Sequence, residues 1–182
     1  MKFISSAIGV EIEDLNGDVS LSNYSMFVEN GNKSGTNSFY SIIFTDEEKN
    51  MGEIHFTKSF EYGSLNVIPF IRIENIFFIL TSSTQHLKYF KYILDNMLER
   101  KISYRKLKLD PDKINESTVI MNFDVISKNN YELIGIFTLN MKRFILKFYS
   151  NGIISFPHNE NIQQLISILN FYLEIIRGMD RD

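Results

Sequence analysis

The residues that could do chemistry in this chain are few and scattered. It contains no cysteine, which excludes disulfides, thiolate metal sites and cysteine nucleophiles. The three histidines, His55, His86 and His158, lie far apart and do not predict a metal site. Glycine-rich phosphate loops, calcium loops and Gly-x-Ser-x-Gly elbows are absent from the sequence. We therefore predict no catalytic residue, no metal, no cofactor and no small-molecule ligand, and hence a non-enzymatic protein. An enzyme whose pocket no local motif reveals is the alternative.

The most distinctive charged segment runs over residues 100–108. Its lysines and arginines lie on both sides of one tyrosine. Such cations can contact phosphates, and a tyrosine can stack on bases. In an extended strand, Tyr104, Lys106 and Lys108 share one face. The alternative is a helix whose C-terminus favours cations through its dipole, followed by an exposed linker. The predicted nucleic-acid contacts in this segment are Tyr104, Arg105, Lys106 and Lys108.

The net charge of −3 is unevenly distributed along the chain. Residues 1–63 contain four basic and ten acidic residues, a balance of −6, and residues 64–182 contain 15 basic and 12 acidic residues, a balance of +3. A chain-wide basic field for nucleic acid is therefore absent. Any basic contact surface is expected beyond residue 64, while the acidic half and the many aromatic residues favour a protein partner.

Hydrophobic periodicity predicts an α+β fold. Apolar residues at helical spacing predict long amphipathic helices over residues 84–101 and 160–177, and Asn16-Gly17 and Asn151-Gly152 predict hairpin turns. The fold class expected from these patterns is an antiparallel sheet with both helices packed on one face. Strands are predicted over residues 3–12, 19–28, 39–45, 53–58, 65–73, 75–80, 118–126, 131–139, 143–149 and 153–156.

The same order of elements occurs twice. A strand, a polar cap and an amphipathic helix follow one another at residues 75–101 and again at 151–177, at an offset of 76 to 78 residues. This order predicts two similar halves, 1–109 and 110–182, which share a core in one structural domain with a pseudo-two-fold repeat. Asp110-Pro111-Asp112 is the predicted junction. The alternative is a coincidence of two strand–helix units.

Three short motifs carry a resemblance to a known family. They are Leu146–Gly152 followed by Ile153-Ile154, Glu132–Ile136, and Lys113–Asn115. On these motifs the chain resembles the TATA-box-binding protein fold, over roughly residues 65–178. In that family two repeats form a saddle, and each repeat ends in a strand turn and a long helix. The sequence departs from the family pattern at Ile134, where the family has Phe, and in lacking a Lys after the turn.

The resemblance implies a DNA interface on the concave side of the sheet. In the family, phenylalanines wedge between base steps in the minor groove and kink the duplex. Phe148 matches a wedge position, and Phe70 is its expected counterpart in the first half. Either Asn115 or Thr118 lies near the groove-reading Asn of the family. If the resemblance holds, Phe70 and Phe148 should be exposed.

These observations lead to two functional hypotheses. The first is a transcription factor of TATA-box-binding-like fold that binds double-stranded DNA. The second is a protein–protein interaction module, such as a complex subunit, adaptor or inhibitor, without DNA binding. No signal peptide or membrane helix is evident in the sequence, so we expect a soluble, intracellular protein, in cytoplasm or nucleus, with no membrane partner.

Overall fold

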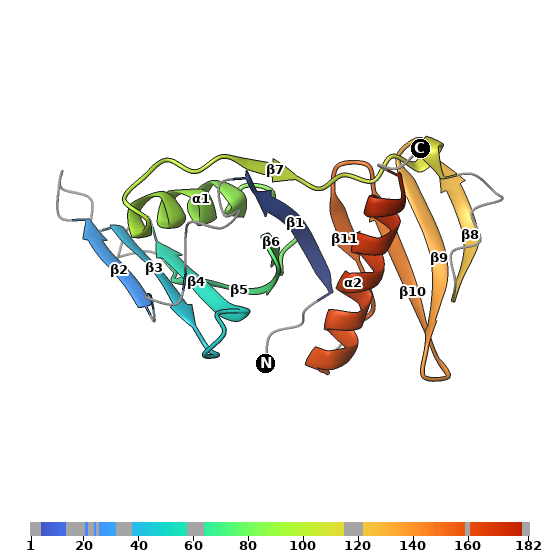
Figure 1. Cartoon of the computed structure of the whole chain (residues 1–182), viewed down its shortest axis with the longest axis horizontal. Coiled ribbons are helices and arrows are strands. Elements are labelled where there is room, and N and C mark those ends of the chain that lie inside the picture. Colours follow the sequence, from blue (N-terminus) through green and yellow to red (C-terminus); the bar gives the residue numbers. More distant parts are fainter. Residues whose placement is uncertain are drawn as a thin grey trace. The chain divides into compact units, whose positions relative to one another are not determined.

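The computed structural model describes residues 5–13, 21, 24, 26–31, 38–57, 64–114, 122–158 and 161–179. It confirms the α+β class, with antiparallel strands and two long helices (Figure 1). The chain forms two compact units, which are Val10–Arg105 and the combination of Met1–Gly9 with Lys106–Asp182. The strand β1 (Ser6–Ile12) contributes residues to both units. The predicted boundary between the halves follows residue 109, whereas the units divide between Gly9 and Val10 and again between Arg105 and Lys106.

The unit Val10–Arg105 is an antiparallel meander followed by a helix. The strands are hydrogen-bonded in the order β2-β3-β4-β5-β6-β1, and the helix is α1 (His86–Met97). A short strand, β7 (Tyr104–Lys106), pairs with β1. The meander consists of β2 (Met26–Gly31), β3 (Ser38–Phe44), β4 (Met51–Thr57), β5 (Asn66–Ile73) and β6 (Ile76–Ile79).

Helix α1 covers one face of this meander with its apolar stripe. The ring of Phe90 lies 5.1 Å from that of Phe77 and 6.3 Å from that of Phe70. Tyr89 stacks on Phe56 at 4.0 Å. Such aromatic contacts bury large areas and favour tilted or offset geometries, so they fix the helix on the sheet. The buried residues of the helix are Leu87, Phe90, Ile93, Leu94 and Met97.

The other unit is also an antiparallel sheet with one long helix. Its sheet order is β1-β11-β10-β9-β8, and the helix α2 (Ile162–Met179) follows (Figure 1). On α2, Phe171 stacks on Phe137 at 4.4 Å, and Tyr172 lies 5.4 Å from Phe148. One face of the sheet is therefore covered by α2. The strands are β8 (Phe123–Asn129), β9 (Glu132–Leu139), β10 (Lys142–Tyr149) and β11 (Ile153–Ser155).

Most predicted elements lie close to the observed ones. Both helices are present within a few residues of their predicted bounds, and Gly152 has a φ of 85° in the predicted Asn-Gly turn, a conformation that glycine adopts without strain. The predicted junction contains a 3₁₀ turn, η3 (Pro111–Lys113), in which the Asp110 side chain accepts a hydrogen bond from the Asp112 amide at 3.1 Å. The Asn16-Gly17 turn lies outside the described residues.

The buried hydroxyl of Tyr172 makes stability depend on pH. Burial raises the pKa of Tyr172 well above its usual value, and the hydroxyl donates a hydrogen bond to the Leu107 carbonyl at 3.4 Å. In the unfolded chain a tyrosine ionises near pH 10. The unfolded state therefore loses its proton first, and stability should fall as the pH rises above about 10.

Urea unfolding at a series of pH values tests this expectation. The Tyr172→Phe variant should show a smaller loss of stability above about pH 10 than the unsubstituted protein, because it has no hydroxyl to ionise at this position. Equal losses in the two proteins would show that Tyr172 does not control the alkaline limit.

Candidate functional site

The two phenylalanines expected as exposed wedges are buried. Phe70 is 1% exposed and Phe148 is 0% exposed. Both lie on the face of their strand that the helix covers: Phe70 contacts Phe90 of α1, and Phe148 lies 6.3 Å from Phe171 of α2. The prediction that they are exposed is wrong, because large aromatic side chains next to an amphipathic helix are stabilised by burial in the core.

The predicted nucleic-acid contacts in residues 104–108 do not form one exposed cluster of cations. Arg105 is bound to Glu11 through its Nη2 at 2.7 Å and its Nε at 3.1 Å. Lys106 is half-buried, and the pKa of its amine is lowered by burial and further by the nearby Lys108. Tyr104 is also half-buried, while Lys108 is exposed.

The side chain of Lys106 lies against the Asn151-Gly152 turn. A Cβ placed on Gly152 would approach the Lys106 Cε at 3.1 Å and the Leu107 carbonyl oxygen at 2.4 Å. The extended stretch therefore packs on the predicted Asn-Gly turn, and Lys106 contributes to that packing. The predicted groove-reading candidates Asn115 and Thr118 lie outside the described residues.

A different surface brings exposed apolar and basic side chains together. Side chains alternate along β10, so Phe144, Leu146 and Phe148 share the α2 side of the strand. The side chains between them lie on the opposite side, which we call the open face. Ile145 is 52% exposed there, between Arg143 and Lys147.

The neighbouring strand extends this surface. In the register of β9 and β10, Ile145 is opposite Ile136 and Lys147 is opposite Ile134. Side chains of directly opposite residues are about 4.5–5.5 Å apart at Cβ and lie on the same face. Three isoleucines and two cations therefore form one continuous surface. We call it the open-face patch, defined as Ile134, Ile136, Arg143, Ile145 and Lys147.

The open-face patch has a defined border. Along its rim, Asp124 of β8 is opposite Ile136, Ser127 is opposite Ile134, and Ser155 of β11 is opposite Lys147. Within the described parts of the chain, neither Arg143 nor Lys147 forms an ion pair. The two cations are thus available for an anionic partner group beside an aliphatic surface.

No protein-family model, curated protein or solved structure matches this chain. The site is therefore defined by its own geometry. Among the residues that the structure describes, no helix is long and apolar enough to cross a membrane.

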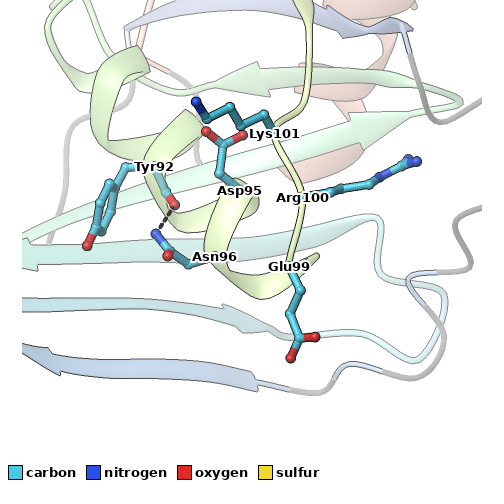
Figure 2. A pocket seen from close by; sticks show the side chains of 6 residues that line it. All are labelled: Tyr92, Asp95, Asn96, Glu99, Arg100 and Lys101. Atoms are coloured by element: carbon cyan, nitrogen blue, oxygen red, sulfur yellow. Dashed lines mark hydrogen bonds between the residues drawn. The ribbon is translucent and has the colours of Figure 1, made fainter.

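A shallow hollow at the C-terminal end of α1 is the other candidate site (Figure 2). Asp95 accepts hydrogen bonds from Lys91 at 2.7 and 2.9 Å and from the Ile102 amide at 2.8 Å. Asn96 donates to the Tyr92 carbonyl at 2.7 Å, as the dashed line in Figure 2 shows. These hydrogen bonds pair backbone groups at the end of the helix and in the segment that follows it. The residues around the hollow therefore stabilise the helix end, and we assign them a structural role. It is lined by Tyr92, Asp95, Asn96, Glu99, Arg100 and Lys101.

Two of the histidines, His55 and His86, have structural contacts. His55 lies 2.9 Å from Glu53 between its Nε2 and a carboxylate oxygen, and His86 Nδ1 lies 2.7 Å from the Thr81 hydroxyl. Burial lowers the pKa of His86, which favours its neutral form. No group of three or more His, Asp or Glu side chains that could hold a metal is present in the described ranges.

The open-face patch was not predicted, although its pattern is visible in the sequence. Residues 143–148 alternate between a face with Arg143, Ile145 and Lys147 and a face with Phe144, Leu146 and Phe148. Both faces contain apolar residues, so alternation alone does not indicate which one the helix covers. The face that carries the phenylalanines is the more buried one, which leaves Ile145 and Arg143 exposed and Lys147 half-buried.

Proposed function

We propose that this chain is a non-enzymatic interaction module that binds a protein partner through the open-face patch. The observation that carries the proposal is the exposure of Ile145 between two cations, at the centre of a hydrogen-bonded sheet. Contiguous exposed apolar surface in a folded protein is typical of binding sites. Sheet strands hold these side chains rigidly, which lowers the entropic cost of binding.

Burial of the expected wedges favours the protein partner over DNA. The aromatic side chains that the DNA hypothesis needed on the surface, Phe70 and Phe148, lie in the core. Carboxylates at Asp124 and Glu132 lie on the same side of the sheet as the open-face patch, since they are opposite Ile136 and Tyr149. Negative charges at this border weaken the field that attracts a polyanion.

DNA binding by a TATA-box-binding-like saddle is the second candidate function. One observation supports this hypothesis. The sheet is covered by a helix on one face and carries Arg143, Lys147 and Thr138 on the other. Isoleucine is also among the side chains that can wedge between base steps. Under this alternative, Ile145 and Ile136 replace the phenylalanines as wedges, and the pseudo-two-fold repeat supplies the second half of the saddle.

A capture experiment tests the proposed function. The tagged chain, immobilised and exposed to a lysate of its source organism, should retain one protein in stoichiometric amount. The Ile145→Asp variant should lose it, because a buried, unpaired carboxylate at the centre of an interface is strongly unfavourable. The control is Ile162→Asp, which changes an isoleucine that is 40% exposed in the first turn of α2.

The possible results separate the two candidate functions. Loss of the protein with Ile145→Asp alone supports the protein partner. Retention of the protein by both variants contradicts the open-face patch as the binding site. The tagged chain is also titrated with a fluorescent AT-rich DNA duplex. If it binds the duplex, if the affinity falls steeply with salt, and if Ile145→Asp abolishes the binding, DNA binding replaces the protein partner as the function.

A further inference from the structure

The charges of the open-face patch indicate what kind of partner segment fits it. Arg143 and Lys147 are four residues apart on β10, a separation of about 13 Å along a strand, and Ile145 lies midway. The methylene groups of Arg and Lys extend the aliphatic surface while their charged ends reach water. The patch thus presents an aliphatic centre with a cation at each end.

Of the two carboxylates on this side of the sheet, Asp124 is distant from the line of cations, whereas Glu132 on β9 is the diagonal neighbour of Lys147, at about 7–8 Å. Asp124 lies on β8, which is separated from β10 by β9. Neighbouring strands are about 4.8 Å apart, so about 10 Å separates β8 from the line of cations. A partner carboxylate placed over β10 is therefore closer to Arg143 and Lys147 than to Asp124.

We infer that the open-face patch binds an acidic, aliphatic segment of another protein, with carboxylates that pair with Arg143 and Lys147 and aliphatic side chains that cover Ile134, Ile136 and Ile145. This inference rests on the proposed function and specifies the chemistry of its partner. A phosphate backbone alone supplies anions without the aliphatic groups that this centre needs.

Two acidic strands of a second copy are poor occupants. Where Glu11 and Glu53 alternate with apolar neighbours, those neighbours are fully buried, so these segments present carboxylates without an accessible aliphatic row. Strand β8 of a second copy has both groups, since Asp124 precedes the exposed Val125 and Ile126. Dimer formation is therefore one of the outcomes that the test below separates from binding of another protein.

Two matched peptides provide the test. The first is a fluorescein-labelled amphipathic helix of about 20 residues with a leucine stripe flanked by Glu, and the second has Lys in place of every Glu. Fluorescence anisotropy against the full chain should show tighter binding of the Glu peptide by about tenfold or more at low salt, since charge complementarity selects the partner. The double variant Arg143→Glu/Lys147→Glu should reverse this preference.

Lys142→Glu is the charge control. Lys142 is an exposed cation on β10 in the same alternation as Phe144, on the α2 side. It should leave the preference for the Glu peptide unchanged. A preference that weakens equally with Lys142→Glu would indicate a long-range charge effect and overturn the inference.

The remaining results distinguish failure of this inference from failure of the proposed function. If both peptides bind equally and Ile145→Asp abolishes both, the acidic partner is wrong but the open-face patch remains the binding surface. If the Glu peptide does not bind, the inference is overturned. If Ile145→Asp affects the binding of neither peptide, the inference is overturned and the open-face patch is also not the binding surface of the proposed function. A dimer that Ile145→Asp dissociates would assign the surface to a second copy and contradict the inference.

Discussion

Replacing Phe148 with alanine should lower the free energy of unfolding by about 3–5 kcal/mol. Phe148 is fully buried, and its ring lies 5.8 Å from that of Phe123, 6.3 Å from that of Phe171 and 5.4 Å from that of Tyr172. The smaller side chain removes apolar contacts and leaves a cavity between β10 and α2, which packed neighbours fill only in part. Urea unfolding followed by circular dichroism measures the loss.

Ile145→Ala is the matched control for this prediction. Ile145 lies on the same strand, three residues away, but on the open face, where its side chain is about half exposed. Its replacement should change stability by less than about 1 kcal/mol. If Phe148 were instead an exposed wedge, Phe148→Ala would leave stability unchanged and abolish binding, and that result would contradict its place in the core.

Gly135→Ala should destabilise the same unit through a clash with one ring. A Cβ on Gly135 would lie 2.3 Å from Phe123 Cζ and 2.7 Å from each Cε. The ring cannot move away freely, because Phe123 packs against Phe171 at 5.2 Å and Phe148 at 5.8 Å. Forcing a methyl group into such a packed site costs about 1–3 kcal/mol.

A double-mutant cycle attributes this cost to Phe123. In a Phe123→Ala background the ring is absent, so Gly135→Ala should cost less than about 1 kcal/mol, although Phe123→Ala alone is destabilising. Additive effects of the two substitutions would show that the alanine disturbs β9 by a route other than contact with the ring.

Local patterns predicted the elements of this fold well. The helical spacing of apolar residues predicted α1 and α2, and the Asn151-Gly152 pair predicted the turn between β10 and β11. These features depend on residues that are close in sequence. A strand was predicted over residues 118–126; β8 spans Phe123–Asn129, and residues 118–121 of the prediction lie outside the described residues.

Features that depend on distant residues were not predictable in the same way. The ion pair between Arg105 and Glu11 joins residues that are 94 positions apart in the sequence, so no local pattern predicts it. Phe148 was assigned to a surface because a short motif resembled a wedge position, but the position of α2 decides which face of β10 is covered. Burial under a helix depends on tertiary structure. Strand alternation therefore divides the side chains of β10 between two faces, but it does not show which face the helix buries.

The most direct test of the open-face patch is isoleucine methyl NMR of the chain bound to the protein that it captures. The methyl signals of Ile134, Ile136 and Ile145 should shift on binding, because the partner covers them. The signals of Ile162 on α2 and of the buried Ile168 should stay in place, since they lie on the other side of the sheet or within the core. Shifts confined to isoleucines outside the open-face patch would contradict its role as the binding surface.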